Sequence, residues 1–185
     1  MAAKPIIKVV AICGSLRKAS TNHGLLRSAI ELSESIEGMS IEHVDISPLP
    51  MLNTDLEVDG KYPPVVEDFR RKILESDCFL FASPEYNYSI TGNFDLPPNV
   101  WANKPAAIVS AGGGFGGGRS QYHLRQIGVF LDLHFINKPE FVVNAFQPPP
   151  KFNNDGDLID PATKVRLKDV LLSLKAFALR LQQGN

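Results

Sequence analysis

Residues 6–22 read IIKVVAICGSLRKASTN, and this stretch decides the fold class. Its first part is a β-branched, apolar run that stops at Gly14. A strand covered on both faces needs no polar alternation, so residues 6–13 are predicted to form a buried strand. Ser20 and Thr21 are candidate helix N-caps, and apolar residues then recur at helical spacing until about Gly38. A strand, a polar loop and a helix in succession form the repeating unit of a parallel sheet.

The rest of the chain continues this alternation. Further strands are predicted at residues 41–46, 78–82 and 106–110, with a broken last strand at 134–136 and 140–143. Helices are predicted at residues 65–73, 119–130 and 167–181. Such alternation predicts a doubly wound α/β sheet with right-handed crossovers, in which ligands bind beyond the carboxyl ends of the strands. A chain of 185 residues has the usual size of one domain, so we expect a single domain over residues 1–185.

Composition excludes several classes of function. The chain has 19 basic and 20 acidic residues and a net charge of −1. Nucleic acids and anionic membranes select a basic surplus, which is missing here, and a strongly acidic electron carrier is equally disfavoured. No apolar run approaches the ~20 residues of a membrane span. Cys13 and Cys78 match no disulfide or zinc pattern, so we expect free thiols and a cytoplasmic protein.

The loop after the first strand, residues 14–22, combines hydroxyl groups, two cations and the start of a helix. A helix N-terminus carries unsatisfied N–H groups and the positive end of a dipole, which together favour a phosphate. Ser15, Ser20 and Asn22 can add hydrogen bonds, and Arg17 a charge-assisted one. The loop matches neither GxxxxGK[ST] nor GxGxxG, which excludes the usual triphosphate and dinucleotide motifs. An ordinary polar turn is the alternative.

Two later loops follow buried strands at the same predicted edge. Residues 83–89 read SPEYNYS, and their rings and polar groups suit a flat ligand; tyrosines packed for stability are the alternative. Residues 112–120 read GGGFGGGRS and hold six of the 14 glycines. Glycine lets the backbone approach a ligand closely, and a flexible linker is the alternative. The three loops together suit a phosphorylated planar cofactor.

The motifs GSLRKASTN, SPEYNYS and GGGFGGGRSQYHLRQ, in this order and spacing, resemble the NADPH-dependent FMN reductase family, and its plant NAD(P)H:quinone oxidoreductases most of all. The resemblance extends from Ile7 to about Leu181. It implies a flavodoxin-like, five-stranded parallel sheet of order 2-1-3-4-5 that binds FMN. It also implies hydride transfer from NAD(P)H to the flavin and two-electron reduction of a quinone in a ping-pong cycle, in a homodimer or homotetramer.

The resemblance assigns site residues by matching positions. The phosphate loop is implied at Ser15, Arg17, Ser20 and Asn22. The loop beside the isoalloxazine ring is implied at Pro84, Glu85, Tyr86 and Asn87. The loop on the other side of the flavin is implied at Ser110, Gly112, Gly113, Gly114, Phe115, Gly116 and Gly117. Because the chemistry belongs to the flavin, we expect neither a catalytic side chain nor a metal. Tyr122 and His123 can touch a quinone oxygen or simply face solvent.

One segment departs from the family pattern. Relatives carry a helical stretch similar to PLKNAIDWASR before PPNVW, whereas residues 90–101 here read ITGNFDLPPNVW. We therefore expect a short or absent helix after Gly92, and we expect the sheet face that it covers in relatives to be exposed. Three hypotheses follow: an FMN-dependent NAD(P)H:quinone oxidoreductase, a one-electron flavodoxin-type carrier, and a flavin-binding protein whose activity is impaired.

Overall fold

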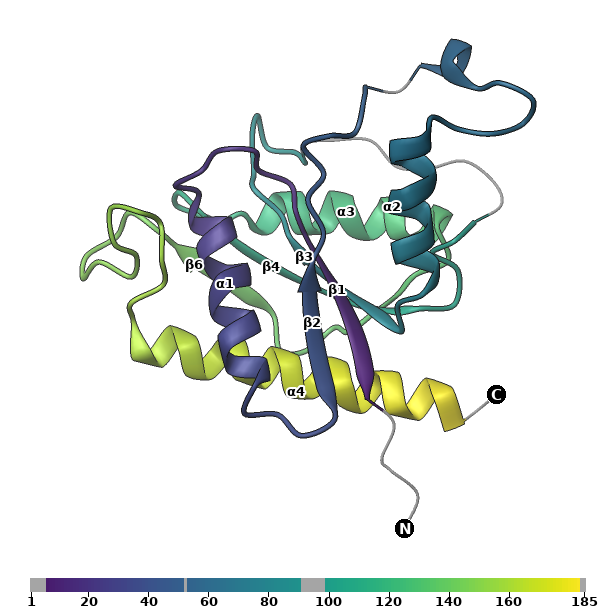
Figure 1. Ribbon diagram of the computed structural model, residues 1–185. Coiled ribbons are helices and arrows are strands. Elements are labelled where there is room, and N and C mark those ends of the chain that lie inside the picture. The colour runs from purple at the N-terminus through teal and green to yellow at the C-terminus, as the bar shows by residue number, and fades with distance from the viewer. Residues whose placement is uncertain (1–5, 52, 91–98, 184–185) are drawn as a thin grey trace.

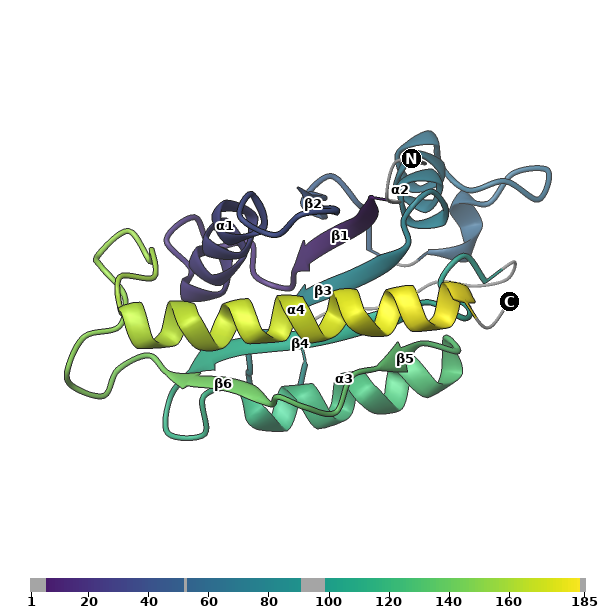
Figure 2. The same ribbon diagram turned by 90° about the horizontal axis from the view of Figure 1, so that it is seen from below.

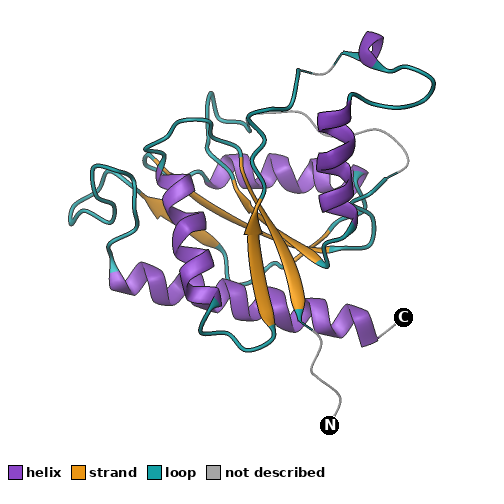
Figure 3. Ribbon diagram, viewed as in Figure 1, coloured by secondary structure: helices purple, strands orange, loops and turns teal. Residues whose placement is uncertain are grey.

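The computed structural model describes residues 6–51, 53–90 and 99–183, in which strands and helices alternate as predicted (Figures 1 and 3). The strands are β1 (Ile7–Cys13), β2 (Met39–His43), β3 (Cys78–Ala82), β4 (Pro105–Gly112), β5 (His134–Phe135) and β6 (Phe141–Asn144). The helices are α1 (Thr21–Ser33), α2 (Pro64–Leu74), α3 (Gly118–Phe130) and α4 (Pro161–Gln183), with a 3-10 turn η1 (Thr54–Leu56).

The sheet has the predicted order. Its strands run β2-β1-β3-β4-β5, and every neighbouring pair is parallel. The fifth position is shared, because β6 also pairs with β4, further along that strand than β5 does. The predicted order 2-1-3-4-5 is thus confirmed, with two short strands where a single broken one was expected.

Helices cover both faces of this sheet (Figures 1 and 2). On one face, apolar side chains of α1 and α4, such as Leu25 and Leu171, pack against Val9 and Leu80 in a single core cluster. On the other face, α2 and α3 contribute side chains such as Ile73 to a second cluster. Since β1, β3 and β4 are buried on both faces, their near-continuous apolar sequences follow from their position in the middle of the sheet.

Trp101 covers the sheet face where the resemblance implies a longer helix. The described residues between β3 and β4, 83–90 and 99–104, contain no helix. Trp101 is 2% exposed, and its ring centroid lies 4.9 Å from that of Phe79 and 6.0 Å from that of Phe69 on α2. Phe79 is fully buried. The expectation of an exposed sheet face was therefore wrong here, whereas the shortened segment itself, residues 91–98, lies outside the described residues.

No helix in the described part of the chain is long and apolar enough to cross a membrane.

Candidate functional site

Three loops meet at one edge of the sheet. They follow β1, β3 and β4, which are adjacent parallel strands, so their carboxyl ends lie together. The chain reverses its direction of winding between β1 and β3. In doubly wound sheets the crevice at this reversal is where ligands bind.

The loop after β1 is held in shape by its own polar groups. Ser20 caps α1, its Oγ accepting the N–H of Asn22 at 3.3 Å. The Oγ of Ser15 accepts the N–H of Arg17 at 3.3 Å. His23 donates from Nε2 to the carbonyl oxygen of Ser15 at 2.7 Å, a contact that the sequence pattern did not indicate. The side chain of Arg17 is exposed, and within the described residues it has no ion-pair partner, which leaves a cation at the helix start.

Asn22 joins this loop to β4. Its side-chain nitrogen donates to the carbonyl oxygen of Ala111, and its side-chain oxygen accepts the N–H of the same residue, both at 3.0 Å. The side chain is 3% exposed. Both polar ends of the amide are therefore engaged with the backbone of β4. Asn22 thus fixes the start of α1 relative to the glycine-rich loop at residues 112–118, called the glycine loop below.

The glycine loop contains glycines of two kinds. Gly116 has a positive φ of 58°, and a Cβ added to it would lie 2.9 Å from the Val143 nitrogen. Gly117 has a positive φ of 83°, and a Cβ added to it would lie 2.7 Å from the Ser110 Cβ. Backbone geometry and packing explain both. At Gly113 and Gly114, φ lies outside the left-handed region and a Cβ would meet no atom within 4 Å. Nothing within the described residues explains glycine at these two positions, and their bare backbone is open to close approach by a ligand.

Ser110 and Gln121 support the glycine loop from its buried side. The Oγ of Ser110 donates to the carbonyl oxygen of Gly116 at 2.7 Å and accepts from Nε2 of Gln121 at 2.8 Å. Ser110 is fully buried. It therefore shapes the loop and does not face open space.

The loop after β3 is fastened to the start of α3. Glu85 accepts the backbone N–H of Arg119 at 2.9 Å, and its other carboxylate oxygen lies 3.4 Å from Nη1 of Arg119. The guanidinium of Arg119 also lies over the rings of Tyr88 and Phe115, at 4.2 and 3.8 Å from their centroids. One arginine thus contacts the loop after β3 and the glycine loop, and no sequence motif indicated this double role.

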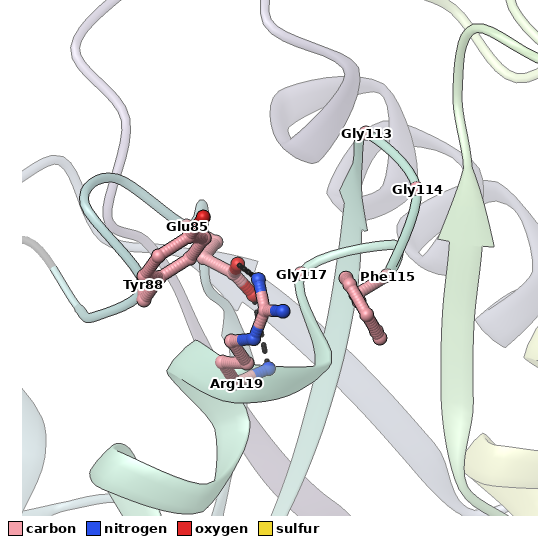
Figure 4. A pocket seen from close by; sticks show the side chains of 7 residues that line it. All are labelled: Glu85, Tyr88, Gly113, Gly114, Phe115, Gly117 and Arg119. Carbon is pink, nitrogen blue, oxygen red and sulfur yellow. Dashed lines mark hydrogen bonds and ion pairs between the residues drawn. The ribbon is translucent and has the colours of Figure 1, made fainter.

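These two loops and Arg119 line a half-open cavity of ≈ 340 Å³. Figure 4 shows Arg119 reaching up between Glu85 and Tyr88 on one side and Phe115 on the other, with Gly113 and Gly114 above. Five of the residues assigned by the resemblance line the cavity: Glu85, Gly113, Gly114, Phe115 and Gly117. The other ten do not: Ser15, Arg17, Ser20, Asn22, Pro84, Tyr86, Asn87, Ser110, Gly112 and Gly116. Tyr86 belongs to the same loop and is 58% exposed.

The cavity and its surroundings fit FMN. The bare backbone at Gly113 and Gly114 and the aromatic groups opposite form walls for a flat ring system. The first turn of α1 with Arg17 offers donors and positive charge to a phosphate.

The thiols of Cys13 and Cys78 take no part in this site. Burial raises the pKa of Cys13 to about 11 and raises that of Cys78 further, so both are neutral packing groups. No group of three or more potential metal ligands occurs in the part of the chain that the structure describes.

Comparison with known proteins identifies the family. Residues 7–148 match the family model described as NADPH-dependent FMN reductase. This chain belongs to the NADPH-dependent FMN reductase family. Among similar proteins, an NAD(P)H:quinone oxidoreductase of Solanum tuberosum is 70% identical over 98% of both chains. An NADPH:quinone oxidoreductase of Arabidopsis thaliana is 68% identical over 98% of this chain and 96% of its own.

A similar solved structure has the same fold. FerB of Paracoccus denitrificans, a flavoenzyme NAD(P)H:(acceptor) oxidoreductase, superposes with a TM-score of 0.77 at 27% identity, covering 96% of this chain and 98% of its own. The flavodoxin-like architecture expected from the motifs is therefore confirmed, and it covers nearly the whole chain.

Proposed function

We propose that this protein is an FMN-dependent NAD(P)H:quinone oxidoreductase, which reduces quinones by two electrons while NAD(P)H and quinone occupy the site in turn. The observation that carries this proposal is the pair Gly113 and Gly114, which face open space across from Glu85 and Tyr88 at the reversal point of the sheet. Chains of this family that are 70% and 68% identical are named as quinone oxidoreductases.

The residues that would hold FMN fall into three sets. Ser15, Arg17, Ser20 and Asn22 would form the phosphate end, where Asn22 acts by fixing the helix start. Pro84, Glu85, Tyr86 and Asn87 would lie beside the ring. Ser110, Gly112, Gly113, Gly114, Phe115, Gly116 and Gly117 would form the opposite wall, with Ser110 acting from behind. When bound, FMN supplies the two-electron transfer between NAD(P)H and quinone.

The chain itself binds and orients. Arg119 pairs with Glu85, so this wall of the cavity does not present an uncompensated negative charge to anionic NAD(P)H. The exposed aromatic side chains of Tyr88 and Phe115 line the cavity and offer apolar surface that suits flat substrates. No acid or base is needed from the protein in this proposal.

An absorbance experiment tests the function and distinguishes it from both alternative functions. The purified protein, loaded with FMN, is mixed with NADPH and then with a quinone. A quinone oxidoreductase loses the flavin absorbance with NADPH, regains it with quinone, and oxidises NADPH continuously in the presence of both. Neither a one-electron carrier nor a flavin-binding protein with impaired activity turns over NADPH, so with either rival the flavin keeps its oxidised spectrum throughout.

We also propose a single cytoplasmic domain that assembles as a homodimer or, following the family, a homotetramer. Val129 and Phe130 at the end of α3 are 81% and 74% exposed, which supports burial against a second copy. The free, buried state of Cys13 and Cys78 supports a reducing compartment. Light scattering coupled to gel filtration measures the assembly, and imaging of a fluorescent fusion measures the location.

A further inference from the structure

The loop after β3 contains a strained turn. Tyr86 and Ser89 form a two-residue hairpin, exchanging N–H···O hydrogen bonds of 3.1 and 2.9 Å. The two residues between them, Asn87 and Tyr88, have φ values of 50° and 62°. Such turns ordinarily carry glycine at one of these positions. A tyrosine in the left-handed region is uncommon, and its backbone strain persists only where the surroundings hold it.

Helix α3 supplies what holds the turn. Before the turn, Glu85 accepts the backbone N–H of Arg119 at 2.9 Å. At its end, Oγ of Ser89 and Nδ1 of His123 share a hydrogen bond of 2.9 Å. Arg119 and His123 are four residues apart and so lie on one face of the helix. The turn is thus tied at both ends to the first two turns of α3.

The strain is not compensated by burying Tyr88. Its side chain is 68% exposed, it lines the cavity, and its ring lies 4.2 Å from the Arg119 guanidinium (Figure 4). A turn that is strained, tied down and yet places its aromatic ring at the mouth of a cavity has no purpose in core packing. The Tyr88 ring is instead accessible to a molecule that enters the cavity.

We propose that the Tyr86–Ser89 turn is a preorganised wall for the quinone, that Tyr88 contacts the quinone ring, and that His123 is a positioning residue that acts through Ser89. This inference rests on the function proposed above and deepens it. Since Tyr86 and Asn87 of the same turn are assigned to the flavin ring, the effect on quinone is measured on FMN-loaded protein, and the FMN affinity of each variant is measured beside it.

The experiment is a double-mutant cycle on the FMN-loaded protein with Ser89→Ala, His123→Ala and the double variant. Each single variant raises the KM for quinone about threefold to tenfold, the worth of one hydrogen bond, with kcat little changed. The double variant is no worse than either single one, because both remove the same contact. His123→Asn, whose amide reaches the position of Nδ1, restores the KM. Gln126→Ala, an exposed change on the same helix, is the matched control and has no effect.

A second readout needs neither FMN nor turnover. Hydrogen exchange of the Tyr86 and Ser89 amides in the cofactor-free protein accelerates in His123→Ala and is restored in His123→Asn. Unchanged exchange, additive effects on the KM, or faster exchange with an unchanged KM each overturns the proposal. Absence of turnover in the unmodified protein contradicts the proposed function instead, and the exchange measurement then still decides whether His123 holds the turn.

Discussion

Asn22 at the start of α1 is hydrogen-bonded to Ala111 at the end of β4 through both ends of its amide, each at 3.0 Å. The two residues are 89 positions apart in the chain, and this contact connects the loop after β1 to the loop after β4. One buried side chain therefore ties the loop after β1 to the end of β4, where the glycine loop begins.

Replacing Asn22 by alanine leaves the N–H and the carbonyl of Ala111 without their partner. A buried polar group that loses its partner costs about 1–3 kcal/mol, so the free energy of unfolding of the cofactor-free protein falls by about this amount. Urea denaturation measures it. Lys18→Ala, an exposed change in the same loop, is the control, and equal stability of the two variants would refute the role of the contact.

Arg17→Ala removes the exposed cation beside the first turn of α1. If this residue binds the FMN phosphate, the loss is that of a charged hydrogen bond, roughly 1.5–3 kcal/mol, or about a tenfold to hundredfold weaker FMN affinity. Fluorescence titration with FMN measures the affinity. Lys18→Ala changes the net charge equally and weakens binding less; if both variants behave alike, Arg17 contributes only through net charge.

Trp101→Ala opens the sheet face that Trp101 covers. Removing a buried aromatic side chain from a core costs about 3–5 kcal/mol, and the neighbouring rings of Phe69 and Phe79 lose a partner. The free energy of unfolding falls by this amount, whereas Trp101→Phe retains part of the packing and costs less. A loss below about 1 kcal/mol, within the range of volume-conserving swaps, would show that another part of the chain covers this face.

His43 makes stability depend on pH. Partial burial lowers the pKa of its side chain, the neighbouring His23 lowers it further, and Asp45 raises it to a lesser extent. A folded-state pKa below the unfolded value means that protons bind preferentially to the unfolded chain. The contribution of His43 to the free energy of unfolding is complete above pH ~6.5, the pKa of an unfolded histidine. This contribution is lost as the pH falls towards the lower pKa of the folded state. His43→Gln flattens the dependence between pH 7 and 5 in urea denaturation, and an unchanged slope would exclude His43 as its source.

Local patterns predicted most of the fold. The apolar runs that became β1, β3 and β4 could be recognised because strands buried on both faces show no alternation. Gly38, expected near the end of a helix, instead precedes β2, and α1 ends earlier at Ser33. Helix ends depend on a few weak signals, which is why they are predicted less well than the helices themselves.

Contacts between distant residues could not be predicted in the same way. The position of Trp101 against Phe79 arises only when α2, β3 and the residues before β4 pack together. Asn22 matched a phosphate-loop motif, yet the structure engages its amide with Ala111. Arg119 stood beside a glycine run with nothing in its local sequence to show that it contacts Glu85, Tyr88 and Phe115 at once. These roles follow from tertiary proximity, which a motif does not contain.

The central claim is that a planar cofactor lies against Gly113 and Gly114, and FMN titration combined with urea denaturation of Gly114→Ala tests it most directly. The added methyl group meets no described protein atom, so the free energy of unfolding stays equal or rises by up to about 1 kcal/mol, while crowding of the ligand weakens FMN binding by about tenfold. Gly116→Ala, at positive φ and in close contact with Val143, is the counterpart that loses stability. Undiminished FMN affinity in Gly114→Ala, or no binding of FMN by the unmodified protein, would contradict the account.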